Sequence, residues 1–195
     1  GEVRPGNVSI KGLTLRYAGG TQSVPPALAN AGAALNLKGG SFVFSDLRLE
    51  RSPVGLWVTG QGSPQIQSSR IVGNGIGLRS SLTATPTITQ SSLAENTSYG
   101  VLNDSPQSVV QAANNWWGHP TGPRDSASNP SGQGSRVSSG VAYQPYLTLD
   151  PSGKPGPTMT LSFAGQALSA GATLRNAGEL VLSAYSAKGV TQLEA

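Results

Sequence analysis

The 195-residue chain contains no cysteine and a single histidine, His119. Without thiols it can form no disulfide, and one imidazole without cysteine argues against a zinc site. Charged residues are scarce at 11%, and the net charge is +4. The 13 basic residues are scattered without a Lys/Arg run, so the sequence does not indicate a nucleic-acid partner. No apolar stretch approaches the roughly 20 residues of a membrane span.

Glycine and proline are abundant instead, with 26 and 14 residues, and Ser, Thr, Asn and Gln replace the usual charged surface residues. This composition is typical of many short strands joined by turns rather than of helices. The chain opens on Gly1-Glu2-Val3, and we expect it to be a piece of a longer exported protein.

A unit of about 22 residues recurs along the chain. Each copy has an apolar residue, a second one five positions later, and a glycine beyond; these are Phe44, Ile66 and Ile88, then Leu49, Ile71 and Leu93, then Gly55, Gly77 and Gly100. A further step of 22 reaches Val110. An earlier copy, residues 10–15, precedes residues 44–49 by 34, because a loop at 21–30 is inserted.

Apolar residues alternate within each copy, as Leu47 and Leu49 do, which is the period of a strand. One copy is too short to bury its own apolar face, but stacked copies pair their backbones about 4.8 Å apart. We therefore expect an all-β parallel β-helix with interior columns from Ile10 to Val110 and from Leu15 to Leu93. Asn74 and Asn96, one step apart, are expected at its corners, in the left-handed conformation that a sharp turn needs.

The segment 111–147 departs from the repeat. It runs through Asn114-Asn115-Trp116-Trp117-Gly118, a Gly/Pro-rich loop and Tyr143-Gln144-Pro145-Tyr146-Leu147. This resembles the terminal segment of bacterial right-handed parallel β-helix repeat proteins of the pectin-lyase-like superfamily. The resemblance covers about residues 8–150 and implies a right-handed coil with a C-terminal cap. The bulky residues of the segment would seal the apolar end of the stack, and the alternative for the Trp pair is a sugar-stacking platform.

We expect three parts: the β-helix and cap at 1–150, a linker at 151–157, and a partial antiparallel immunoglobulin-like segment at 158–195. The last part alternates as strands at 158–163, 179–185 and 190–193. Three strands are too few for a sandwich of about seven. The chain could continue, the segment could pack on the helix, or a partner chain could complete it.

The superfamily includes lyases, hydrolases, esterases and non-enzymes, so the fold alone does not assign an activity. The resemblance would imply acidic calcium ligands with an Arg base, or several Asp residues on one face. Neither cluster is visible, and we predict no catalytic residue, cofactor or metal. Asp46, Arg48 and Glu50 point outward on one strand, and Arg70 lies one step from Arg48. We interpret them as a surface ion-pair network, with a binding site for an acidic sugar as the alternative.

Trp57 is expected to point outward, in a column with Asn36, Arg79 and Leu102. Trp57 beside Arg79 could stack on sugar rings or on another protein, unless the loop 21–31 covers it. His119, in the Gly/Pro loop, has no nucleophile motif near it and is interpreted as a bystander or as a hydrogen-bonding residue of the cap.

The sequence thus favours a non-catalytic module located outside the cell or on its surface, in a surface protein, adhesin or filament. The alternatives are a fragment of a polysaccharide lyase or hydrolase, and a carbohydrate-binding module. Candidate binding residues are Trp57, Arg79, Arg48 and Arg70. Expected partners are a polysaccharide, or further copies of the chain joined through the C-terminal strands.

Overall fold

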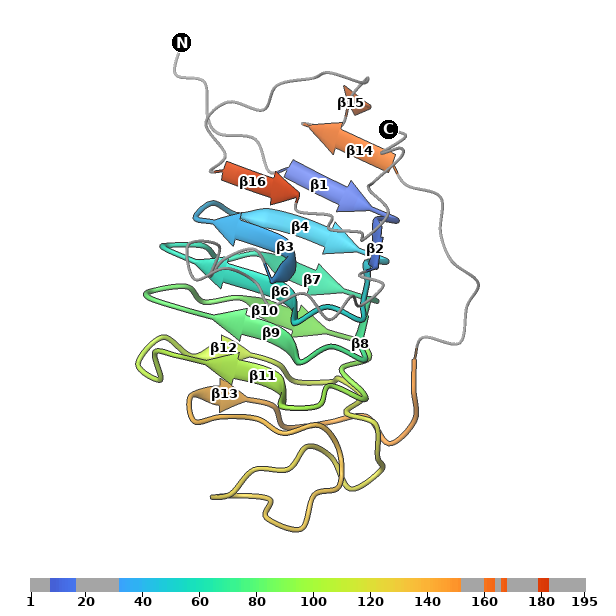
Figure 1. Cartoon of the computed structure of the whole chain (residues 1–195), viewed down its shortest axis with the longest axis vertical. Helices are drawn as coiled ribbons and strands as arrows, with labels where there is room; N and C mark the ends of the chain where they lie inside the picture. The colour runs from blue at the N-terminus through green and yellow to red at the C-terminus, as the bar shows by residue number, and fades with distance from the viewer. Residues whose placement is uncertain (1–7, 17–31, 152–159, 164–165, 168–178, 183–195) are drawn as a thin grey trace.

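The computed structural model is a parallel β-solenoid of about four turns (Figure 1). It describes residues 8–16, 32–151, 160–163, 166–167 and 179–182. Every regular element in these residues is a β-strand, and none is a helix. No helix in the described part of the chain is long and apolar enough to cross a membrane. The expected all-β parallel solenoid is therefore confirmed.

Three sheets run along the stack, and the first three coils contribute a strand to each, whereas the later coils add no strand to the third sheet and continue it only through isolated bridges. The first contains β1 (Val8–Lys11), β4 (Phe42–Ser45), β7 (Gln65–Gln67), β10 (Thr87–Thr89), β12 (Val110–Gln111) and β13 (Val141–Ala142). The second contains β3 (Ala33–Lys38), β6 (Val54–Thr59), β9 (Ile76–Ser80) and β11 (Tyr99–Asn103). The third contains β2 (Thr14–Arg16), β5 (Arg48–Glu50) and β8 (Arg70–Val72). All pairings among these strands are parallel.

The interior columns follow the predicted register over most of their length. Phe44 pairs with Ile10 on one side and Ile66 on the other, and Ile66 pairs with Ile88. Leu49 likewise lies between Leu15 and Ile71 in the third sheet. All of these side chains are buried, so like residues stack on like residues through the core.

The last step differs from the prediction. The repeat is 22 residues where Arg70 pairs with Ser92, and it lengthens to 24 where Thr87 pairs with Gln111. The residue after Gln111, Ala112, therefore takes the place next to Ile88 that we expected for Val110. Leu78 pairs with Val101 at an intermediate step of 23. One of the two extra residues therefore lies before β11, and the other lies after it.

The corners are also built differently from the prediction. Left-handed φ angles occur at the residues just before Leu47 and the polar side chains of the two corners, namely Asp46, Ser68, Gln90 and Asn114 at one corner and Arg51, Gly73 and Glu95 at the other. Asn74 and Asn96 are not among the residues with positive φ. They are buried instead, and their side-chain amides form hydrogen bonds with the backbone of the neighbouring coil.

Two chains of hydrogen bonds connect the coils at these corners. In one, the N–H groups of Ser52 and Asn74 donate to the Oδ1 atoms of Asn74 and Asn96, each at 3.0 Å, and the Asn96 N–H donates to Ser135 Oγ at 3.2 Å. In the other, the N–H groups of Leu47, Ser69 and Ser91 donate to the side-chain oxygens of Ser69, Ser91 and Asn115 at 2.9–3.1 Å. We call these the corner ladders.

The expected glycine column has a steric cause. A Cβ atom on Gly77 would lie 2.5 Å from the carbonyl oxygen of Gly100 in the next coil, and one on Gly55 would lie 2.8 Å from that of Gly77. No real Cβ contact is that short, so the coils can approach here only where the side chain is absent.

Trp117 closes the far end of the solenoid. Ser92 bridges to Trp116, and the Leu93 N–H donates to the Trp116 carbonyl at 2.7 Å, which places Trp117 next to Leu93 at the end of that interior column. Trp117 is 0% exposed and meets the ring of Tyr143 edge-on, with 6.4 Å between centroids. Its Nε1 has no hydrogen-bond partner among the described residues, so packing alone holds the indole.

The other end pairs with the C-terminal strands (Figure 1). β14 (Thr160–Phe163) pairs antiparallel with β1, β15 (Gln166–Ala167) pairs with β14, and β16 (Glu179–Leu182) pairs antiparallel with β3. These strands extend the sheets of the solenoid, and an immunoglobulin-like sandwich is not shown. The predicted linker after residue 151, the loop 21–30 and the strand at 190–193 lie outside the described residues.

The interior column provides the first test. Phe44→Ala should lower the free energy of unfolding by about 3–5 kcal/mol, because truncating a fully buried ring leaves a cavity that the stacked coils cannot fill. Urea denaturation followed by circular dichroism measures this change. Gln67→Ala, an exposed position on β7, should change it by less than about 0.5 kcal/mol. Similar losses for the two variants would contradict the column.

Candidate functional site

One outward-facing column connects two of the residues predicted to bind. Arg48 pairs with Arg70 in the third sheet, Arg70 bridges to Ser92, and Ser92 bridges to Trp116. Consecutive members lie on adjacent coils, about 4.8 Å apart along the stack. The predicted stacking of Arg48 on Arg70 is thus confirmed, and the column continues to a tryptophan.

Acidic groups reduce the electrostatic repulsion between the stacked guanidinium groups of Arg48 and Arg70. Glu50 Oε1 lies 3.9 Å from Arg48 Nη1 and 3.6 Å from Arg70 Nε. Asp150 Oδ2, from the end of the cap, lies 3.4 Å from Arg70 Nη1 and accepts a hydrogen bond from Ser92 Oγ at 3.2 Å. These pairs form the predicted surface network, with each partner partly exposed, so each contributes little to stability. Asp46 pairs instead with Lys11, at 3.7 Å.

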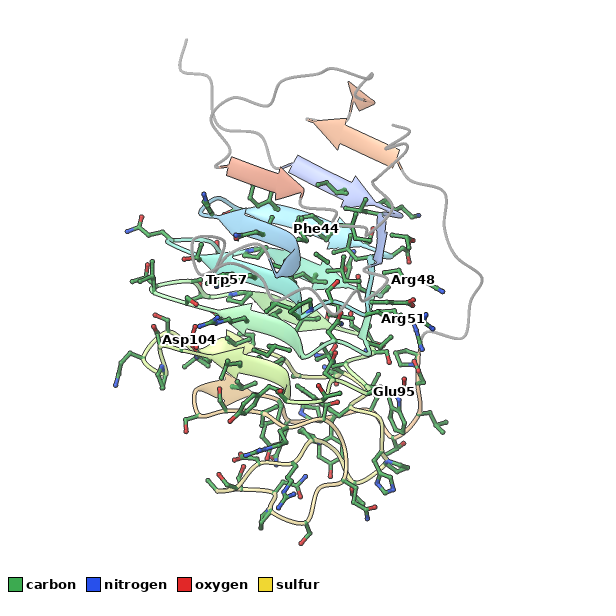
Figure 2. All side chains as sticks on the ribbon, in the orientation of Figure 1. Phe44, Arg48, Arg51, Trp57, Glu95 and Asp104 are labelled. Atoms are coloured by element: carbon green, nitrogen blue, oxygen red, sulfur yellow. The ribbon has the colours of Figure 1, made fainter. Side chains whose placement is uncertain are left out.

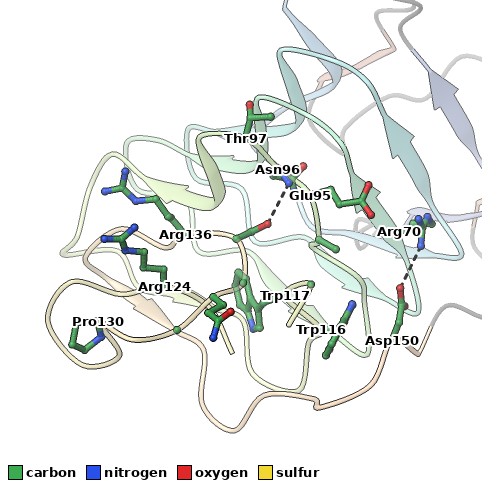
Figure 3. Close-up of a pocket in the computed structure, with 16 residues that line it drawn as sticks. Arg70, Glu95, Asn96, Thr97, Trp116, Trp117, Arg124, Pro130, Arg136 and Asp150 are labelled. Atoms are coloured by element: carbon green, nitrogen blue, oxygen red, sulfur yellow. Dashed lines mark hydrogen bonds and ion pairs between the residues drawn. The ribbon is translucent and has the colours of Figure 1, made fainter. Parts of the chain in front are cut away.

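A groove opens where this column reaches the cap (Figure 3). Its volume is about 990 Å³, and it lies between the corner at residues 94–97 and the cap segment 130–136. Trp116 and Trp117 line it, and Trp116 is only half-buried. Figure 3 shows Arg70 and Asp150 at one end of the groove and Arg124 and Arg136 at the other. We call this the cap groove.

The two arginines at the far end of the cap groove come from adjacent backbone segments. The Val137 N–H donates to the Arg124 carbonyl at 3.0 Å, and both arginine side chains line the groove. The Arg136 guanidinium lies over the ring of Tyr99, with 5.1 Å from Cζ to the centroid. In the described part of the chain, neither arginine forms an ion pair.

Trp57 and Arg79 form a closed cluster on the second sheet. Trp57 pairs with Asn36 and with Arg79, as predicted. The Arg79 guanidinium covers one face of the indole at 4.7 Å, and Trp57 Nε1 donates to Ser81 Oγ at 3.0 Å. Asp104 accepts from Arg79 Nε at 2.8 Å and from Ser81 Oγ at 2.6 Å.

Trp57 Nε1 and Arg79 Nε therefore both have partners within the cluster, and Arg79 covers one face of the Trp57 ring. The structure does not join this cluster to Arg48 and Arg70, because the two pairs belong to different sheets, and Figure 2 shows Trp57 and Arg48 at opposite edges of the view. The loop 21–31, considered as a cover for Trp57, lies outside the described residues.

Asp125 organises the cap loop beyond the groove. Its carboxylate accepts hydrogen bonds from the Ser128 hydroxyl and, at 3.0 Å, from the Ala127 N–H. The Ser128 hydroxyl also lies 2.6 Å from the Tyr143 hydroxyl, which ties the loop to the buried seal. The Ser128 hydrogen bond is the largest cause that lowers the pKa of Asp125 below its ordinary value of 3.8, against a partial desolvation that raises it.

His119 makes only local contacts. Its Nδ1 lies 2.9 Å from Thr121 Oγ1 and 3.3 Å from the Thr121 backbone N–H, within the same turn. Within the described ranges, no three His, Cys, Asp or Glu residues are grouped closely enough to hold a metal ion.

Comparison with known proteins adds no relative: no family model, no curated protein and no solved structure matches the chain.

The sequence predicted Arg70 as a site residue and gave a sugar-stacking platform as the alternative for the Trp pair, but it missed Arg124 and Arg136 and did not place Trp116 in the same groove as Arg70. A signal for Trp116 was present, because adjacent residues of a strand face opposite sides, so one member of a Trp-Trp pair must point outward if the other is buried. Arg124 and Arg136 lie in irregular segments with no period to place them, and only the fold brings them together.

The Asp125 network provides the second test. Because its folded-state pKa is lowered, its stabilising effect is full above the ordinary value of 3.8 and is lost as the pH falls through the folded-state pKa. Thermal unfolding midpoints from pH 7 downward should therefore fall less in Asp125→Asn than in the natural chain below about 3.8. Glu95→Gln, which removes an exposed carboxylate, is the matched control. Parallel curves for Asp125→Asn and the natural chain would contradict this role.

Proposed function

We propose that the chain is a non-catalytic extracellular module of a cell-surface protein, in which the stacked coils act as a stiff spacer. The corner ladders are the observation that carries this proposal. They use the buried polar side chains of three successive coils to accept hydrogen bonds from the backbone of the preceding coil. Because these buried polar groups hydrogen-bond the backbone and make the stack rigid, they suit a scaffold better than a catalytic centre.

Two finer assignments belong to the same proposal. We propose a right-handed β-helix of the pectin-lyase-like type, supported by the Asn-Asn-Trp-Trp-Gly segment at 114–118 and by the parallel solenoid. We also propose that residues 158–195 begin an immunoglobulin-like module. Support for that assignment comes from the alternating pattern of the segment and from the antiparallel pairing of its described strands.

The competing assignment is a fragment of a polysaccharide lyase or hydrolase. Incubating the full chain with polyuronates and with neutral polysaccharides, with added calcium, should produce no new reducing or unsaturated ends. Cleavage by the natural chain that disappears in Arg48→Ala or Arg70→Ala would establish the enzyme instead, since these are the partly exposed cations of the outward column. Arg51→Ala, which removes an exposed arginine outside that column, is the control.

A filament assembled through the C-terminal strands is a second candidate function, favoured by the pairing of β14 with the outermost strand β1. The same antiparallel contact between copies would join them end to end. Ser9 and Ser162 are directly opposed in this pair. Opposed residues in antiparallel strands have Cα atoms about 4.5–5.5 Å apart, which a disulfide can span.

The double variant Ser9→Cys, Ser162→Cys distinguishes the two arrangements, because the chain has no other cysteine. After oxidation, a non-reducing gel should show a monomer with an internal disulfide when the strands pair within one chain, as in the structure. A ladder of covalent multimers that grows with protein concentration would support the filament. The single variant Ser9→Cys controls for random oxidation and can give dimers only.

A further inference from the structure

We propose that the cap groove is a binding site for an anionic polysaccharide, with a sugar ring against Trp116 and acidic groups of the glycan held by Arg124 and Arg136. This site is separate from the Trp57 cluster and does not depend on the spacer role.

Trp116 is suited to stack on a sugar because its backbone is fixed and its ring is partly open. Its N–H donates to the Ser91 carbonyl at 2.9 Å, and its carbonyl accepts from Leu93 at 2.7 Å. The side chain is half-buried and lines the groove, while Trp117 behind it is fully buried. A ring held by the last coil loses little conformational freedom when a ligand packs against it.

Arg124 and Arg136 supply the charge complementarity for an anion. Neither has a carboxylate partner among the described residues, so binding an anion would not first require breaking an ion pair. The Tyr99 ring supports the Arg136 guanidinium from one face. A guanidinium held in this way keeps its N–H edge available, and that edge matches a carboxylate or sulfate group with two parallel hydrogen bonds.

The other end of the cap groove carries negative charge, which orients an anionic ligand along the groove. Arg70 is already paired there with Asp150, and Glu95 adds an exposed carboxylate to the lining. An acidic group is therefore favoured at the Arg124 and Arg136 end and disfavoured beside Glu95. Since the groove presents an indole between these ends, a chain of sugar rings that carries carboxylate or sulfate groups fits its chemistry better than an acidic peptide does (Figure 3).

Calorimetric titration of the full chain tests this site, with galacturonic acid oligomers, sulfated dextran, neutral dextran and polyglutamate as probes. At least one of the two acidic glycans should bind, and the carboxylated and sulfated probes show which group is preferred. Arg124→Ala and Arg136→Ala should each weaken that binding about tenfold, because each removes a charge-assisted contact. Trp116→Ala should weaken it by a similar factor, and Glu95→Gln should strengthen it.

Two control variants remove similar groups elsewhere. Arg51→Ala removes an exposed arginine outside the groove, and Trp57→Ala removes the other partly exposed tryptophan; both should bind as the natural chain does. If Trp116→Ala unfolds, Trp116→Phe keeps an aromatic ring and should bind with intermediate affinity. The proposal is overturned if neither acidic glycan binds, if the Arg124 and Arg136 variants bind unchanged, if Trp57→Ala abolishes binding, or if only polyglutamate binds. These binding results leave the spacer proposal untouched, because that proposal is tested separately by the cleavage assay.

Discussion

Stacking of each coil on the next is the constraint on which the rest of the structure depends. A single coil is too short to bury its apolar side chains by itself, and they become fully buried only when the coils above and below are in place. Register is therefore strict, since a slip by one residue would turn Phe44 and its column outward. The corner ladders reinforce this register by giving the buried N–H groups at the bends an acceptor in the next coil, where water cannot reach them.

Repetition also creates the problem of the two ends, and the chain treats them differently. At the C-terminal end a side chain much larger than any in the column above it, Trp117, ends the stack, and Tyr143 packs on its edge. At the other end the free edges of β1 and β3 pair with β14 and β16. One end is thus sealed by side-chain packing and the other by backbone pairing. Backbone pairing carries little sequence information, which is why the same contact could in principle join separate copies.

The cap groove arises where repetition stops. Along the regular coils, an outward column presents similar groups at similar spacing, and Arg48 and Arg70 share Glu50 in this way. At the cap the same column passes to Trp116, and an irregular loop brings Arg124 and Arg136 from a different direction. A concave surface with an aromatic ring and unequal charge at its ends therefore forms only beside the last coil. Trp57 lies in the regular part, where its ring is covered on one face by Arg79 and its Nε1 donates to Ser81.

The sequence by itself determined the period of the solenoid, the members of its interior columns from Ile10 to Ile88, and the stacking of Arg48 on Arg70. These follow from one step of 22 residues, because strands that pair in parallel place equivalent positions side by side. Only the tertiary structure decided the 24-residue last step, the left-handed residues that precede each ladder position, the partner of the C-terminal strands, and the meeting of Arg70, Trp116, Arg124 and Arg136. Each of these depends on the path of an irregular segment, which is set by contacts between residues far apart in the chain and leaves no period in the sequence.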